Sequence, residues 1–138
     1  MDTFNKFSGY GHWLVRLSLA GTFLFHGLRK FPMAQGMADM MGMPVIMVYL
    51  LAMMEVVGGL LILWGGAGPD WATRVAGILF AIVMLGAITM VHWQNGWDFM
   101  AGWGDGTNNA GGMEFQTLIL AVSLFFMVKG NGVNQANV

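Results

Sequence analysis

The stretch from Pro44 to Gly65, PVIMVYLLAMMEVVGGLLILWG, decides the fold of this chain. It is an apolar run with one carboxylate, Glu55, at its centre. As an α-helix rising ~1.5 Å per residue it spans roughly 30 Å, the thickness of the hydrocarbon core of a bilayer. A carboxylate at that depth costs at least ~2.5 kcal/mol, so we expect Glu55 to face protein or water. Gly58 and Gly59 lie on the same side and would let another helix approach closely.

The composition of the whole chain indicates the same class of protein. Of its 138 residues, 57% are hydrophobic and 9% are charged, and the formal net charge is −1. Soluble domains have about 25% charged residues, so the composition indicates an integral membrane protein in a lipid bilayer. The absence of cysteine excludes disulfides, thiolate chemistry and iron–sulfur clusters. We predict no metal site and, because no segment is strongly basic, no nucleic-acid partner.

The hydropathy pattern predicts an all-α transmembrane four-helix bundle that forms a single domain over residues 1–138. The predicted helices cover about residues 13–30, 44–65, 71–93 and 113–129. Residues 31–43 contain Pro32 and several methionines, so we expect a short interfacial segment, partly helical, between the first two helices. Residues 94–112 are predicted to form a polar, Gly-rich loop between the last two helices.

Four spans place both termini on one side of the membrane, which we call side A. The segment 31–43 and the loop 94–112 then lie on the opposite side, called side B. The lysines and arginines assigned to side A are Lys6, Arg16, Arg74 and Lys129. Side B has only Arg29 and Lys30, together with Asp39, Asp98, Asp105 and Glu114. The positive-inside rule therefore predicts a multi-pass protein with cytoplasmic N and C termini.

Polar residues of the first span share one face. Arg16, Phe23, Gly27 and Lys30 fall within ~40° of one another at 100° per residue, and His26 lies beside them. Arg16 and Arg74 lie near helix ends, and their simplest explanation is as anchors whose guanidinium groups reach the interface.

The other spans add polar groups at defined depths. Arg74 and His92 are 18 positions apart, so they share one face of the third span. We expect His26, His92 and Glu114 to converge near side B, although Glu114 is also explained as an acid favoured at a helix start. Inward-facing residues at these depths would form a polar track across the bundle, with Arg16 and Arg74 as candidate partners of Glu55.

Four motifs occur in order along the chain. They are Arg16 with Phe23, His26-Gly27-x-x-Lys30 and Gly42-x-Pro44; then Glu55-x-x-Gly58-Gly59; then His92-x-x-Asn95-Gly96; and finally Gly111-Gly112-x-Glu114-Phe115. As an ordered set from about residue 16 to residue 126, they resemble the DoxX family of membrane proteins. The resemblance implies a four-helix protein of the bacterial inner membrane. It also links the chain to the quinone-reducing membrane part of thiosulfate:quinone oxidoreductase and to oxidative-stress complexes.

The first functional hypothesis is a quinone-interacting or redox-associated subunit of a membrane complex. A quinone needs an apolar slot for its tail, hydrogen-bonding groups at its carbonyls and a source of protons. The candidate catalytic, proton-exchanging residues are Glu55, His26, His92 and Glu114. The candidate cofactor-binding residues, for a quinone or a lipid in the bundle, are Arg16, Phe23, His26, Lys30, Arg74 and His92.

Three other functions are open at this stage. The chain is small enough to be a non-enzymatic accessory or assembly subunit that packs against other membrane-protein subunits. Haem b held between His26 and His92 is a weaker alternative. Copper handling by the Met-rich segment 31–43 is another, since thioethers suit Cu(I), but methionine also packs well at an interface. The sequence does not decide between an enzyme and a binding protein, nor does it give the substrate, the electron donor, the partner chains or the oligomeric state.

Overall fold

The computed structural model describes residues 7–102 and 110–134, and this part of the chain is helical without strands. The elements in chain order are η1 (Ser8–Tyr10), α2 (Gly11–Met41), α3 (Val45–Ala67), α4 (Asp70–Ala87), the π-helix η2 (Ile88–His92), the 3-10 helix η3 (Trp93–Asn95), α5 (Glu114–Lys129) and η4 (Gly130–Asn134). The prediction of an all-α, four-helix fold is confirmed.

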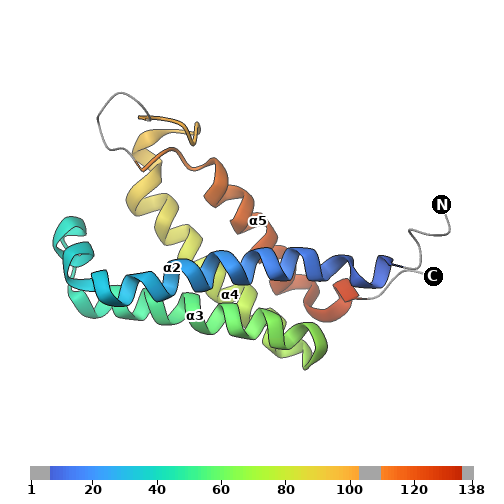
Figure 1. Ribbon diagram of the computed structural model, residues 1–138. Coiled ribbons are helices and arrows are strands. Elements are labelled where there is room, and N and C mark those ends of the chain that lie inside the picture. Colours follow the sequence, from blue (N-terminus) through green and yellow to red (C-terminus); the bar gives the residue numbers. More distant parts are fainter. Residues whose placement is uncertain (1–6, 103–109, 135–138) are drawn as a thin grey trace.

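Consecutive helices pack against one another, α2 on α3, α3 on α4 and α4 on α5. Figure 1 shows α2 and α3 running side by side, while α4 and α5 lean away from them toward the loop that joins α4 to α5. Near the two termini η4 contacts both α2 and α3, so the bundle is closed at side A. The two helix pairs diverge toward side B.

The first helix is longer than the sequence pattern predicted. It continues through Pro32 to Met41, so the segment 31–43, expected to be partly helical, is helical as far as Met41. Figure 1 shows the helix bending in its last part, as a proline that removes a backbone hydrogen bond explains. The helix ends where Gly42 adopts a left-handed conformation, with φ 63°, and Met43 N–H donates to the Ala38 carbonyl.

Three helical stretches are long and apolar enough to cross a membrane, namely Val45–Ala67, Asp70–Asn95 and Glu114–Asn134. They agree with the last three predicted spans to within a few residues. Helix α2 is long enough to cross a membrane, but its mean hydropathy is too low to meet the same criterion. Its mean hydropathy is lowered by polar and charged residues, among them Arg16 and Lys30, and the side chains of these two are turned inward. Its outer surface presents large apolar residues to the surroundings, among them Leu14, Leu17 and Phe25.

The core of the bundle lies at mid-height. The rings of Phe23 on α2 and Phe80 on α4 stack with centroids 3.8 Å apart, and both side chains are buried. A Cβ at Gly58 would lie 2.6 Å from the Phe80 ring, so the glycine makes room for the aromatic pair. Gly77 has the same role between α4 and α5, where a Cβ would lie 2.7 Å from the Ser123 carbonyl. Gly58, noted in the sequence as a packing residue, and Gly77 are therefore contact points between helices.

Candidate functional site

The buried ion pair of the described residues joins α2 to α3. Lys30 Nζ donates to both oxygens of Glu55, at distances of 2.9 and 2.7 Å. The Glu55 side chain is 5% exposed and the Lys30 side chain 13%, so the carboxylate faces the bundle interior as predicted. Its partner is Lys30, which corrects the expectation that Arg16 or Arg74 would bind it.

A glycine on α2 allows this pair to form. A Cβ at Gly27 would lie 2.9 Å from the Cβ of Glu55 and 3.1 Å from the Ala52 carbonyl. The backbones of α2 and α3 therefore approach closely one turn before Lys30, and the lysine side chain reaches the carboxylate without leaving the bundle. One contact between α2 and α3 therefore contains two of the sequence motifs, His26-Gly27-x-x-Lys30 and Glu55-x-x-Gly58-Gly59.

A second polar cluster, the Arg16 cluster, lies at side A and consists of His12, Arg16, Thr73, Asn131 and Asn134. Arg16 is fully buried. Its Nε donates to His12 Nδ1 at 3.0 Å, and one terminal nitrogen donates to Thr73 Oγ1 at 2.9 Å and to the carbonyl of Ile62 at 2.8 Å. The other donates to Asn131 Oδ1 at 3.1 Å and Asn134 Oδ1 at 3.2 Å. The five N–H groups of a guanidinium are all used, each on a neutral acceptor.

The asparagines of η4 tie the Arg16 cluster to the turn between α3 and α4. Asn131 Nδ2 donates to the Gly68 carbonyl at 3.0 Å, and Asn134 Nδ2 donates to the Gly66 carbonyl at 3.2 Å. Thr73 Oγ1 donates to Asn131 Oδ1 at 2.6 Å. Arg16 thus holds the ends of four helical elements together, which is more than an anchor at the membrane interface would do.

The two buried clusters are separated by apolar packing. Phe23 lies midway between Arg16 and Lys30 along α2, seven residues from each. Its stack with Phe80 fills the bundle at this level, surrounded by Leu19, Ala20 and Ile62. The inward-facing residues therefore do not form the continuous polar track that the sequence suggested. Phe23, predicted to bind a cofactor, is part of this core.

Arg74 has a local structural role at side A. It pairs with Asp70 one turn earlier on α4 and donates to the carbonyls of Met127, at 3.1 Å, and Val128, at 2.6 Å. These are among the last carbonyls of α5, which have no partner inside their own helix. A cation is also favoured at a helix C-terminus. Arg74 and His92 lie at opposite ends of the α4 to η2 helical stretch and belong to different clusters.

His92 lies in a third polar cluster near side B, on the π-helical turn that ends the third span. Its Nδ1 donates to the Gly111 carbonyl at 2.9 Å, and its Nε2 accepts from Gln116 Nε2 at 3.0 Å. Asn95 Nδ2 also donates to Gly111, at 2.9 Å. The Gln116 Oε1 atom is buried and has no hydrogen-bond partner in the described part of the chain.

The same region closes the loop between α4 and α5. The N–H groups of Gly112, Met113 and Glu114 donate to the carbonyls of residues 98, 96 and 97, at 2.8, 3.0 and 3.1 Å. A Cβ at Gly112 would lie 2.5 Å from the Asp98 carbonyl, so this position requires glycine. The motifs His92-x-x-Asn95-Gly96 and Gly111-Gly112-x-Glu114-Phe115 therefore pair with one another across the loop.

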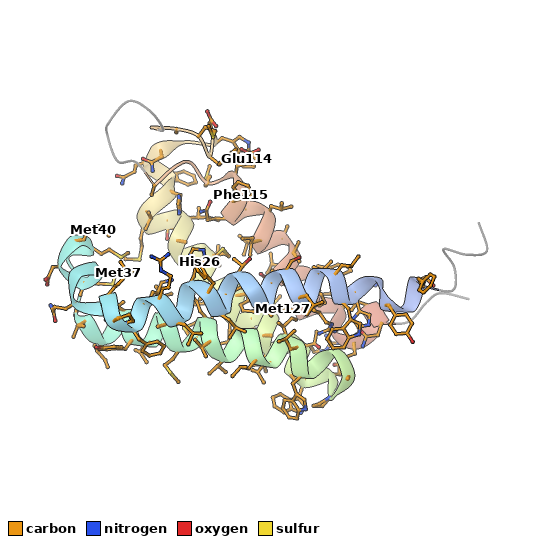
Figure 2. The ribbon with its side chains drawn as sticks, in the orientation of Figure 1. His26, Met37, Met40, Glu114, Phe115 and Met127 are labelled. Atoms are coloured by element: carbon orange, nitrogen blue, oxygen red, sulfur yellow. The ribbon has the colours of Figure 1, made fainter. Side chains whose placement is uncertain are left out.

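His26, His92 and Glu114 do not form one bonded group. No hydrogen bond links these three described side chains. His26 is exposed on α2 and meets the ring of Phe25 edge-on, with centroids 5.4 Å apart. Glu114 is exposed at the start of α5. Figure 2 shows His26 and Glu114 apart from one another, on separate helices.

This geometry gives little support to the two alternative functions, haem binding and copper handling. Both ring nitrogens of His92 are used within the chain, so ligation of haem would break one of these bonds. Figure 2 shows Met37 and Met40 at the end of α2. Met37 and Met43 pack against Ala34, Ala38 and Val48. This agrees with the interpretation that the methionines of this segment serve packing.

Two shallow, open hollows lie along α5 and share one lining residue, and we call them together the α5 groove. The first is about 630 Å³ and lies between the start of α2 and the end of α5. The second is about 440 Å³ and extends toward the start of α5. Ala121 lines both. The walls are mainly apolar and include Val15, Val122, Phe125, Phe126, Phe115 and Leu118.

Several residues of these sites were not predicted from the sequence. His12, Thr73, Asn131 and Asn134 bind Arg16, and Gln116 binds His92. His12 has a sequence signal, because it precedes Arg16 by four residues and so lies one turn away on the same face. The asparagines of η4 have none, since they follow the last apolar span in a segment that reads as a polar tail.

The fold and its buried polar clusters define a small, all-helical membrane protein in which Arg16, Lys30 and Glu55 have their partners inside the bundle. The chain belongs to the DoxX family, whose model matches residues 11–93. It is 32% identical over 130 residues to a Bacillus subtilis (strain 168) protein named "Putative oxidoreductase CatD". The aligned region covers 92% of this chain and 84% of that protein. No solved structure matches the chain.

Proposed function

We propose that this protein is a quinone-interacting subunit of a membrane redox complex. The observation that carries the proposal is the α5 groove, which is apolar along its length and has His12 at one end and Glu114 at the other. A quinone needs apolar surface for its tail and a hydrogen-bonding group for its headgroup, and the groove offers both. The Bacillus subtilis relative is named a "putative oxidoreductase", which supports a redox setting.

The contribution of this chain is to bind and orient the quinone. The sequence has no cysteine and no flavin-binding motif. We therefore place the electron donor in a partner subunit that carries a redox cofactor. In the same proposal the protein lies in a bacterial inner membrane, α2 is the fourth span, and both termini face the cytoplasm. Two observations support this: Arg16 and Lys30 of α2 are turned inward, and side A has an excess of lysine and arginine.

The proposal is tested by extracting the lipids that co-purify with the protein and measuring the quinone bound per chain. We expect quinone with the wild-type protein and its loss in Ala121→Phe, because a ring at the midpoint would block the groove. Ile82→Phe is the matched control, since Ile82 is 52% exposed on α4 and lies outside the groove. An absorption spectrum of the same sample tests haem through its Soret band.

Two results would contradict the proposal. Quinone retained at the wild-type level by Ala121→Phe would remove the groove as its site. A wild-type protein that carries no quinone but co-purifies with a stable partner chain would favour the accessory or assembly subunit, whose groove would then hold a helix of that partner.

A further inference from the structure

The two ends of the α5 groove differ in charge. At side A it is lined by His12, and the buried guanidinium of Arg16 lies directly behind that imidazole. At the other end it is lined by Glu114, which follows the loop between α4 and α5. A headgroup that accepts hydrogen bonds matches the cationic end and is repelled by the carboxylate. The groove therefore distinguishes the two orientations of an elongated ligand.

Arg16 also fixes the proton on His12. Because Arg16 Nε donates to His12 Nδ1, this ring nitrogen is an acceptor, and the proton of the neutral imidazole lies on Nε2. The ring already has a hydrogen-bond interaction with the backbone carbonyl of Gly9, which the carbonyl of a ligand would share or replace. His12 is only partly buried and lines the groove, so its ring is within reach of a ligand lying there. Arg16 is a positioning residue for this donor.

The hydrogen bonds of Arg16 decide which kind of headgroup fits. All five of its N–H groups are bound to the chain's own acceptors. A phosphate group, which needs several donors, would find one imidazole N–H and no free guanidinium donor. A quinone carbonyl needs only one such donor and benefits from the positive charge behind it.

The α5 groove is long enough to hold much of an isoprenoid tail. From Glu114 to Phe126 the axis of α5 extends ~18 Å, at 1.5 Å per residue. Large apolar side chains are exposed along it, including Phe115, Leu118 and Phe125. An isoprenoid chain lying here would cover apolar surface on α5 over most of its span.

We propose that the quinone headgroup binds at the His12 end of the α5 groove, with its carbonyl accepting a hydrogen bond from the His12 imidazole and its tail extending along α5 toward Glu114. This placement rests on the proposed function. It puts the headgroup at side A, away from the Lys30–Glu55 pair and from His92.

The placement is tested with a photoreactive azidoquinone and the purified full chain in phospholipid vesicles. After illumination, we expect label in peptides covering residues 8–15 and 121–133, and its loss on adding unlabelled quinone. His12→Phe keeps a ring but removes the donor, and we expect labelling there to fall about five- to tenfold. His12→Gln can still accept from Arg16 and donate to a carbonyl, so it should recover most of the labelling. Leu28→Phe, at an exposed position of α2 outside the groove, should leave labelling unchanged.

The outcomes separate this inference from the proposed function. Competed label near Glu55, near His92 or at the Glu114 end would overturn the placement while leaving a quinone-binding protein. Label that is displaced by anionic phospholipid but not by quinone would assign the groove to lipid and overturn both. Equal labelling of wild type, His12→Phe and His12→Gln would remove His12 as the donor. Absence of any competed label would overturn both.

Discussion

The Lys30–Glu55 pair makes a quantitative prediction about stability. Two charges at this separation attract by about 6 kcal/mol at an effective dielectric constant near 20, and desolvation opposes this by several kcal/mol per ion. Removal of one partner leaves the other charge buried, so Lys30→Met and Glu55→Met should each cost about 3–5 kcal/mol. The double variant Lys30→Met with Glu55→Met replaces the pair by apolar side chains of similar length. It should lie within about 1–2 kcal/mol of the wild type.

The measurement is the free energy of unfolding in detergent micelles for the four proteins of this double-mutant cycle. Arg29→Met is the control, because Arg29 is the exposed neighbour of Lys30 and stacks on Phe25, a contact worth about 0.5–1 kcal/mol. Neutral hydrogen bonds between helices of a membrane protein average about 0.6 kcal/mol. A coupling energy above about 3 kcal/mol therefore identifies an ionised pair.

A coupling energy below about 1 kcal/mol would refute this reasoning and would indicate a neutral hydrogen bond.

The double variant also tests whether Glu55 transfers protons. Glu55→Gln alone leaves the lysine charge unpaired, so it perturbs assembly whatever the carboxylate does in turnover. The double variant avoids this difficulty. If Glu55 exchanges protons during turnover, membranes with the double variant should contain assembled protein and lack quinone-linked turnover.

Two further predictions concern helix contacts. Gly27→Ala should destabilise the protein by about 1–3 kcal/mol, because its Cβ would lie 2.9 Å from Glu55; Gly21→Ala on the same helix, with nothing within 4 Å, should be neutral or stabilising in the same unfolding assay. Equal effects of the two alanines would contradict the close approach of α2 and α3. Arg16→Lys keeps the charge but loses the planar guanidinium, whose second terminal nitrogen binds Asn131 and Asn134. Amide hydrogen exchange in η4 should therefore rise strongly. Unchanged protection of η4 would show that Asn131 and Asn134 are held by other contacts.

Much of the fold was predictable because each apolar span is bounded by residues that stop a helix. The span predicted over 44–65 is Val45–Ala67, and that predicted over 113–129 is Glu114–Lys129. The first helix was predicted too short, since Pro32 and the methionines after it were taken to break it. A proline that bends a helix does not always end it when side chains beyond the bend, here Ala34 and Ala38, still pack on the next helix.

The same error explains why the partner of Glu55 was missed. Lys30 lies twelve residues before Gly42, and Glu55 lies eleven residues after Pro44. In a tight helical hairpin turning at residues 42–44, the two are at equal depth and therefore adjacent. The nearly equal distances of Lys30 and Glu55 from the turn predict a contact only if residues 31–41 are helical. Helical spacing gave the shared faces of Arg16, Phe23 and Lys30 correctly, but a face alone does not determine which residue of the next helix it meets.

The Arg16 cluster has a consequence for biosynthesis. Arg16 is separated by 115 residues from Asn131 and by 118 from Asn134, so the ribosome completes three further helices before these acceptors exist. Until then two of the guanidinium N–H groups must be satisfied by water or lipid headgroups at the membrane surface. The full burial of this arginine is thus a late event, which can be completed only after the segment following α5 has been made. Nascent chains halted before Gly130 should leave the start of α2 accessible to water, whereas chains released after Asn134 should protect it.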